Sequence, residues 1–196
     1  MFSFFSWKKH KRLDDKVYMK RARADQALLA DAARWKAEGR QIIVICFFEQ
    51  SLDRIESELA RHDLKALQAG AIASDMNVRN ARLAEHAPTF LFVEHHPDLK
   101  TESDAIVELE NIFTEGRPTV GFYAAMDEPL LKLFGTEKIA GLMQKMGMDN
   151  DGAAFADAMI NRAIRNAQSK VSARIAGSMP CRSQEEWIRI NLPGGL

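Results

Sequence analysis

The sequence predicts an α/β domain in which helices cover both faces of a mostly parallel sheet. Residues 41–48, QIIVICFF, contain no polar side chain after Gln41, so neither face of a strand formed by them could stay in water. One helical pattern ends at Gly39, just before this run, and another begins near Gln50, just after it. Buried apolar strands that alternate with helices are typical of parallel sheets.

The elements around this central strand follow the same alternation. A helix is predicted over 19–38, because small and apolar residues recur there at helical spacing and Gly39 is placed to end it. The next predicted elements are a helix over 51–62, a short strand over 64–69, a turn over 70–74 and a helix from Ser74 to about 85.

The second half of the predicted sheet contains two more apolar strands, over 89–93 and 119–124. A helix over 101–113 lies between them. The loop over 94–98, EHHPD, follows the first of these strands at its carboxyl end, where open α/β sheets bind their ligands. Because strands and helices alternate so regularly, the connections are expected to be parallel crossovers.

Beyond Met126 the sequence predicts helices only. Asp127 is placed to cap a short helix with Pro129 in its first turn, and helices over 138–146 and 153–175 follow. The expected organisation is an aromatic and basic arm over 1–16, an α/β domain over 17–126, a helical extension packed on it over 127–176, and an irregular tail over 177–196.

Composition narrows the classes of function. The 196 residues carry equal numbers of acidic and basic side chains, so the whole molecule has no bulk attraction to nucleic acid, and nucleic-acid binding is not expected. The two cysteines, Cys46 and Cys181, lie far apart, which favours a reducing, cytoplasmic setting over a disulfide framework. No apolar run is long enough to cross a bilayer, and the N-terminus has the reverse order of a secretory signal.

The N-terminal arm mixes aromatic and basic side chains. Such a mixture suits the anionic surface of a membrane, which would make the protein peripheral at the inner face. The alternative is an arm whose rings dock on the protein's own surface. The candidates for this interaction are Phe4, Phe5, Trp7, Lys8, Lys9 and Arg12.

Three other groups of residues suggest chemistry at first sight. His95 and His96 lie between Glu94 and Asp98, but adjacent histidines in an extended loop point apart, so no metal site is expected and a solvated loop or an interface is favoured. Cys46 is expected to be an inert core thiol, because an apolar strand raises its pKa. The methionines that include Met143 and Met146 are interpreted either as packing between short helices or as a docking groove for a peptide or helix.

Four stretches resemble one protein family. They are Val17-Tyr-Met with the helix and strand that follow, the buried strand with Glu49, Ser51 and Leu59, the Glu94-His-His segment, and a long block from Gly121 through GFYAAMDEPLLKLFG and KIAGLMQKMGM to INRAIRNAQSKV. Together these stretches resemble the second motor domain of the SecA preprotein translocase ATPase, over about residues 15–175. The resemblance implies a RecA-like, three-layer α/β domain of the helicase superfamily 2 type, followed by a helical extension.

The departures from this family bear on function. The chain contains no GxxxxGK[ST] loop for nucleotide phosphates. Where the resemblance implies an arginine-rich helix, this sequence places Asp104, Glu108 and Glu110, and carboxylates repel phosphate. The residues that remain as candidates for contact with a nucleotide are Glu94, His95 and Arg117.

The expected function is therefore a non-catalytic, SecA-like interaction or regulatory module linked to protein export. No cofactor is expected, with ATP as the one ligand left open, and the expected partner is another protein, related to the translocase. The alternative is the second half of a split ATPase, which would complete an ATP site on another polypeptide.

Overall fold

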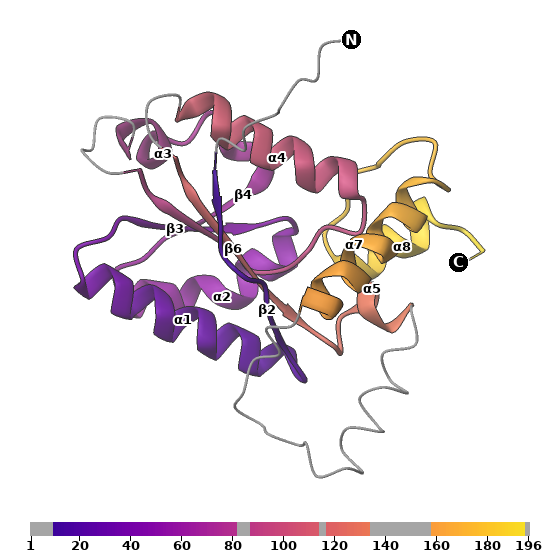
Figure 1. The fold of residues 1–196 in the computed structure, drawn as a ribbon, viewed down its shortest axis with the longest axis horizontal. Helices are drawn as coiled ribbons and strands as arrows, with labels where there is room; N and C mark the ends of the chain where they lie inside the picture. The colour runs from indigo at the N-terminus through magenta and orange to yellow at the C-terminus, as the bar shows by residue number, and fades with distance from the viewer. Residues whose placement is uncertain (1–9, 82–86, 114–116, 134–157, 195–196) are drawn as a thin grey trace.

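The computed structural model describes residues 10–81, 87–113, 117–133 and 158–194. These residues form three layers, with a twisted sheet between two pairs of helices and a further set of helices beyond one end of the sheet (Figure 1). This is the α/β class that the sequence predicts, in the arrangement of a RecA-like domain with a helical extension.

The strands of the sheet all pair in parallel. Their order is β1-β6-β5-β3-β4, and β2 also pairs with β6. The predicted strands are confirmed as β3 (Ile42–Cys46), β4 (Ala66–Gln68), β5 (Thr89–Phe92) and β6 (Thr119–Ala125). Because all strands run the same way, the segments that follow β3, β5 and β6 meet at one edge of the sheet.

Side chains of β3 alternate between two separate cores. Val44 and Cys46 pack with α1 (Arg21–Ala37) and α2 (Glu49–Arg61) on one face. Ile43 and Ile45 pack on the other face with α3 (Met76–Ala81) and α4 (Leu99–Ile112). A 3₁₀ turn, η1 (Ala69–Ala71), joins β4 to α3. The central strand is buried on both sides, as its composition predicts.

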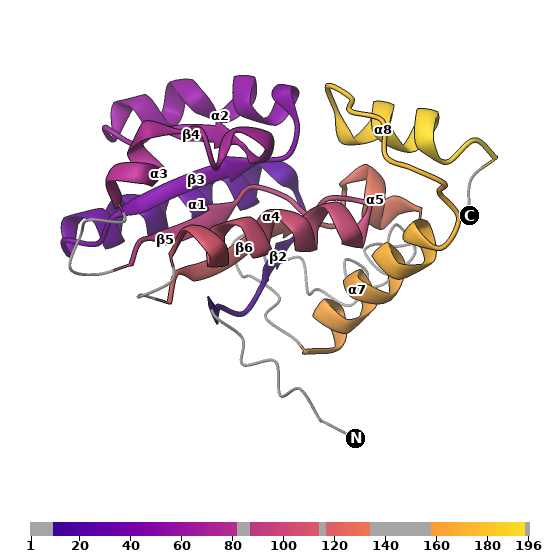
Figure 2. The same cartoon turned by 90° about the horizontal axis from the view of Figure 1, so that it is seen from above.

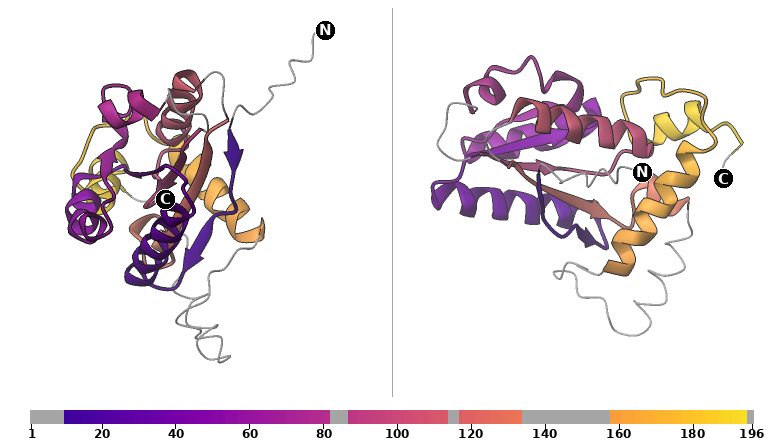
Figure 3. Two further views of the ribbon diagram at one scale, coloured as in Figure 1. Left: turned by 90° about the vertical axis from the view of Figure 1, so that its left-hand side faces the viewer. Right: turned by 45° about the horizontal axis from the view of Figure 1, so that its top comes forward.

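The end of the predicted arm forms the outer edge of the sheet. Strands β1 (Lys11–Arg12) and β2 (Lys16–Tyr18) both run alongside β6 (Figure 3). The expected boundary between arm and domain at residue 16 is therefore wrong for residues 11–16. These strands have two and three residues, too few to show the alternation that marks a strand, and only their pairing with β6 defines them.

Among the described residues, a set of helices lies beyond the carboxyl edge of the sheet (Figure 2). They are α5 (Pro129–Lys132), α7 (Ala158–Ser172) and α8 (Gln184–Asn191). The expected irregular tail is wrong for α8. Ser183 accepts a hydrogen bond from the backbone N–H of Glu186 at 3.0 Å and so caps this helix, in the S-x-x-E spacing of a capping box. The predicted helix over 138–146 lies outside the described residues.

Candidate functional site

The carboxyl edge of the sheet gathers most of the buried polar side chains. Glu94, His95, His96 and Asp98 follow β5, and Glu128 follows β6. Each of these side chains is at most 5% exposed. Ligands of open parallel sheets bind at this edge, so it is the candidate functional site.

Glu94 is held against the start of α2. Its carboxylate accepts a hydrogen bond from the backbone N–H of Phe47 at 3.2 Å and another from the hydroxyl of Ser51. Burial raises its pKa to about 7, although the Ser51 hydroxyl acts in the opposite direction. Glu94 is therefore a carboxylate that changes its charge near neutral pH.

His95 lies between two carboxylates. Its Nδ1 is 2.9 Å from Oε2 of Glu102 on α4, and its Nε2 is 3.6 Å from Oδ2 of Asp15. Burial acts to lower the pKa of His95, but the charge and the hydrogen bond of Glu102 together with the charge of Asp15 outweigh it, so the pKa lies above its ordinary value. The ring also stacks on Phe122 at a centroid distance of 4.5 Å, whereas its Nε2 has no hydrogen-bond partner in the structure.

A register shift places Asp15 beside His95. From Arg12 to Lys16 the edge strand advances by four residues, while its partner β6 advances by three, from Val120 to Tyr123. The extra residue has the effect of a β-bulge, which turns a side chain away from its regular direction. Arg12 holds the Asp15 carboxylate in place with hydrogen bonds of 2.6 and 3.1 Å.

His96 points away from His95 and into an aromatic cluster. Its ring stacks on Phe48 at 5.4 Å and meets Trp187 of α8 edge-on at 5.1 Å. The backbone N–H of Asp98 donates to Nδ1 at 3.0 Å. Burial lowers the pKa of His96 to about 4, so the ring is neutral. The expected solvated loop is wrong, because α8 covers this segment.

Helices α7 and α8 are tied to the histidine segment by amide side chains. Gln168 of α7 donates to the backbone carbonyl of His96 at 2.8 Å and to Glu102 at 2.7 Å. Gln184 of α8 donates to the backbone carbonyl of His95 at 3.0 Å. The helical extension therefore packs directly on the edge where a ligand of this fold would bind.

A small cavity remains at this edge, with a volume of about 190 Å³. Arg21 lines it and pairs with Glu128, and the same guanidinium donates to the backbone carbonyl of Tyr123 at 3.0 Å. Burial raises the pKa of Glu128, although the Arg21 charge acts in the opposite direction. The lining residues are Arg21, Gln50, Ser51, Arg54, Glu94, Asp127, Glu128, Pro129, Gln184 and Glu185.

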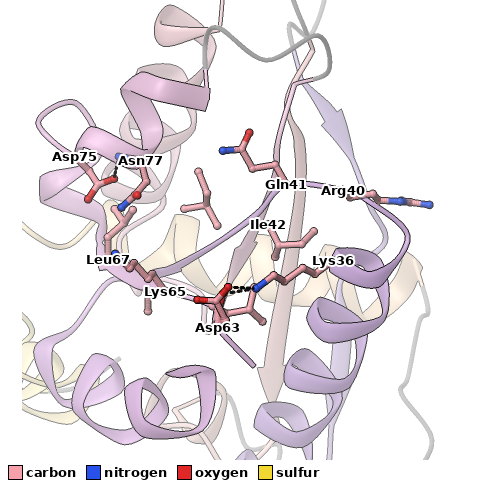
Figure 4. A pocket seen from close by; sticks show the side chains of 12 residues that line it. Lys36, Arg40, Gln41, Ile42, Asp63, Lys65, Leu67, Asp75 and Asn77 are labelled. Carbon is pink, nitrogen blue, oxygen red and sulfur yellow. Dashed lines mark hydrogen bonds and ion pairs between the residues drawn. The ribbon is translucent and has the colours of Figure 1, made fainter. Parts of the chain in front are cut away.

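A second cavity, of about 300 Å³, lies at the opposite edge of the sheet (Figure 4). Lys36 points toward Asp63 there, and its Nζ lies 2.7 Å from the Asp63 carboxylate and 3.1 Å from the carbonyl of His62. Arg40 extends away from the cavity and pairs with Glu38 at 3.1 Å. The Lys36 charge thus fastens the end of α1 to the loop before β4.

The candidate nucleotide contacts are not brought together. Glu94 and His95 lie at the carboxyl edge, whereas Arg117 comes just before Thr119, the first residue of β6, and so lies at the amino edge. The acidic residues of α4 do not face a phosphate site either. Asp104 pairs with Lys100 at 2.6 Å on the surface, and Glu110 pairs with His10 at 2.7 Å near the amino edge. Glu102, which the sequence analysis did not single out, is the carboxylate at the site.

Most of the predicted interaction residues lie outside the described residues. These are Phe4, Phe5, Trp7, Lys8, Lys9, Met143 and Met146. Arg12 is described, and its guanidinium pairs with Asp15 and lies 4.1 Å from the centroid of the Phe122 ring. The charge of Arg12 therefore interacts with groups of the protein itself.

Two further findings concern the described residues alone. No group of three or more His, Cys, Asp or Glu side chains is arranged there to hold a metal ion. In the same part of the chain, no helix combines the length and the apolar character that a bilayer span requires.

The site includes residues that sequence reasoning missed, namely Asp15, Gln168, Gln184 and Trp187. Asp15 lies beside His95 because of a register shift between the edge strand and β6, and no local sequence pattern predicts that shift. Gln168 lies on the buried face of α7, where a polar residue on an apolar stripe signals a hydrogen bond to a neighbour. The capping box at Ser183 was the available signal for α8, and hence for Trp187.

The fold defines a RecA-like α/β domain whose own helical extension covers the carboxyl edge of the sheet. No family model matches the chain. Part of the chain is, however, related to SecA. It is 43% identical over 61 residues to the SecA subunit of Acidithiobacillus ferrooxidans, 48% over 52 residues to that of Solidesulfovibrio magneticus, and 47% over 53 residues to that of Heliobacterium modesticaldum.

These matches are partial on both sides. They cover 26 to 31% of this chain and 6 to 7% of each SecA subunit. Each of the three relatives is described as a protein translocase subunit. The similarity therefore shows a SecA-related segment.

Proposed function

We propose that this chain is a non-catalytic, SecA-related interaction module linked to protein export. The observation that carries the proposal is the closure of the carboxyl edge. Helices α7 and α8 pack on the segment after β5, and they leave His95 2% and His96 5% exposed. A nucleotide bound in the manner of other open parallel sheets would have to displace them.

Electrostatics at the same edge supports the proposal. Four carboxylates line the remaining cavity, and its two arginines are already paired. Arg21 pairs with Glu128, and Arg54 pairs with Asp25 at 2.9 Å. Catalysis of phosphoryl transfer depends on cations placed around the transferring group. In the described part of this edge, carboxyl groups outnumber the arginines, and both arginines are already paired.

The helical extension is the proposed surface for a protein partner. Met179 is 61% exposed and Ile190 of α8 is 39% exposed. The backbone N–H of Met179 donates to the side chain of Asn191 at 2.6 Å, so these two apolar side chains lie at the same end of α8. The aromatic and basic arm over 1–9 is the proposed contact with an anionic membrane surface.

Isothermal titration of the pure protein with ATP and ADP, each with magnesium, tests the absence of a nucleotide site. We expect no saturable binding in the submillimolar range. Tight, magnesium-dependent binding would overturn the proposal. Capture of the translocase subunits by immobilised protein, weakened by a paired change of Met179 and Ile190 to Ser, tests the partner surface.

The alternative, a split ATPase completed in trans, makes a different prediction. It requires Arg117 to act at the ATP site, although this residue lies at the amino edge of the sheet. If this chain raised the ATPase activity of another polypeptide, and if Arg117→Ala abolished that rise, the alternative would replace the proposal.

A further inference from the structure

We propose that the acidic cavity at the carboxyl edge receives the positively charged side chain of a Lys or Arg on a partner protein. This inference rests on the proposed function, since it names the chemistry by which the interaction module recognises its partner. The cavity lies between α2, the segment after β6 and the start of α8.

The shape of the cavity fits the end of one side chain. Ser51, Glu94, Glu128 and Gln184 are buried, each at most 6% exposed, and form its inner wall. Gln50, Arg54 and Glu185 are exposed and form its rim. Its volume of about 190 Å³ is smaller than the roughly 300 to 1,000 Å³ of sites for whole small molecules.

The charge of the cavity calls for a cation. The lining of the cavity contains two arginines, Arg21 and Arg54, and four carboxyl groups, those of Glu94, Asp127, Glu128 and Glu185. Burial raises the pKa of Glu94 and Glu128, and a cation that enters the cavity would favour the charged forms of both. Asp25, outside the lining, pairs with both arginines, at 3.0 and 2.9 Å, which leaves still more of the negative charge uncompensated. A phosphate or another anion would be repelled by this excess.

One buried oxygen lacks a donor. Oε1 of Glu128 accepts from the backbone N–H of Ala125 at 2.8 Å and from Arg21, whereas Oε2 has no hydrogen-bond partner in the structure. Gln184 lies near Glu128 and acts to lower its pKa as a hydrogen-bond donor does, but the hydrogen bond of regular geometry from the Gln184 amide goes to the carbonyl of His95. A buried acceptor without a donor is costly, so this oxygen is set to receive an N–H group from outside.

Arg21 adds a second recognition element beside the first. Its Nη2 also has no hydrogen-bond partner, so it can donate to a carbonyl group. A polypeptide segment supplies both needs, because its basic side chain donates to Glu128 Oε2 and a main-chain carbonyl accepts from Arg21. A metal ion does not fit, since no group of three or more suitable ligands exists among the described residues.

Fluorescence anisotropy with two labelled peptides, (Gly-Arg)₄ and (Gly-Glu)₄, tests the inference at low salt. We expect the full-length protein to bind the basic peptide saturably and to ignore the acidic one. Glu128→Gln should weaken binding by about tenfold or more, because it removes the charge of the buried acceptor. Glu185→Lys should weaken it several-fold through the exposed rim.

The matched control is Glu56→Lys on the outer surface of α2, which changes the net charge as Glu185→Lys does. We expect it to weaken binding less than about twofold. Circular dichroism shows whether Glu128→Gln folds. If it does not, the affinity of Glu185→Lys for the basic peptide, compared with that of Glu56→Lys, tests the inference.

Equal weakening by both lysine variants, or no saturable binding by the unmodified protein, would overturn the inference and indicate a cavity filled by water only. Titration of the same sample with MgATP distinguishes failure of this inference from failure of the proposed function. Absence of both peptide and nucleotide binding refutes this inference and leaves the proposed function standing.

Discussion

The indole ring of Trp187 meets the imidazole ring of His96 edge-on, at a centroid distance of 5.1 Å and an interplanar angle of 77°. Phe48 stacks against the same imidazole at 5.4 Å. His96 belongs to the segment after β5, whereas Trp187 lies in the last described helix. This contact therefore fastens α8 to the carboxyl edge of the sheet.

Removing this indole should destabilise the protein strongly. We expect Trp187→Ala to lower the free energy of unfolding by about 3 to 5 kcal/mol, because the side chain is 1% exposed. Ile190→Ala in the same helix is the control, and we expect it to cost less than about 1 kcal/mol, since this side chain is 39% exposed. Urea unfolding measures both. Similar losses for the two variants would show that α8 does not depend on this contact.

Two buried groups should give the stability opposite dependences on pH. Burial raises the pKa of Glu94 from 4.5 to about 7, so its neutral form stabilises the fold at low pH, and this contribution is lost as the pH rises through about 7. Burial lowers the pKa of His96 from 6.5 to about 4, so its contribution is present above pH 6.5 and is lost as the pH falls toward 4. The two trends offset each other in the unmodified protein.

Glu94→Gln should separate these trends, because glutamine stays neutral at every pH. Relative to the unmodified protein, the variant should gain unfolding free energy on the order of 3 kcal/mol between pH 5 and about pH 8. Denaturant unfolding at a series of pH values measures the difference. A difference that did not change with pH would mean that Glu94 is ionised throughout.

The ion pair between His95 and Glu102 should be strongly coupled. We expect Glu102→Gln to cost about 3 to 5 kcal/mol of stability, because it leaves a buried cation with a weaker partner. The pKa of His95, followed by NMR of its ring, should fall in the variant. Asp104→Asn is the control on the same helix, and we expect it to leave the stability almost unchanged, since its pair with Lys100 is exposed to water. An unchanged His95 pKa in Glu102→Gln would contradict the assignment.

The two cysteines should differ in reactivity. Burial raises the pKa of Cys46, whose side chain has no exposed surface in the fold, whereas Cys181 is partly exposed. We expect the native protein to present one thiol to a colorimetric disulfide reagent and the unfolded protein to present two. Fast reaction of both thiols in the native state would show that β3 is accessible.

The proposed membrane contact is tested by flotation with anionic liposomes. A chain that begins at His10 keeps β1 and β2 and removes only the arm over 1–9. We expect the full-length chain to float and the shortened chain to remain at the bottom of the gradient. Equal flotation of the two would remove the arm from the proposal.

The central sheet could be predicted from the sequence because its strands carry their own signal. The strand at 42–46 is apolar on both faces, and only a layer of helices on each side satisfies it. The edge strands could not be predicted in this way. Lys11, Arg12 and Lys16 are polar, and they belong to strands only because their segments pair with β6.

The sequence could indicate where Glu94 and His95 lie but not how they are surrounded. The rule for parallel sheets places both residues at the carboxyl edge. Their burial depends on Gln168, Gln184 and Trp187, which are distant in the sequence, so no local pattern shows that the segment is covered. Arg117 precedes the first residue of β6, and in a parallel sheet this position places it at the amino edge, away from Glu94 and His95.

The edge formed by β1 and β2 also governs the order of assembly. His10, at the start of this edge, contacts Glu110, a residue 100 positions later, and the strands that follow His10 pair with β6. During synthesis β1 and β2 leave the ribosome before β6, so they have no partner until β6 has emerged. The growing chain must carry this segment unpaired until β6 follows it, and the edge of the sheet is complete only when the two have paired.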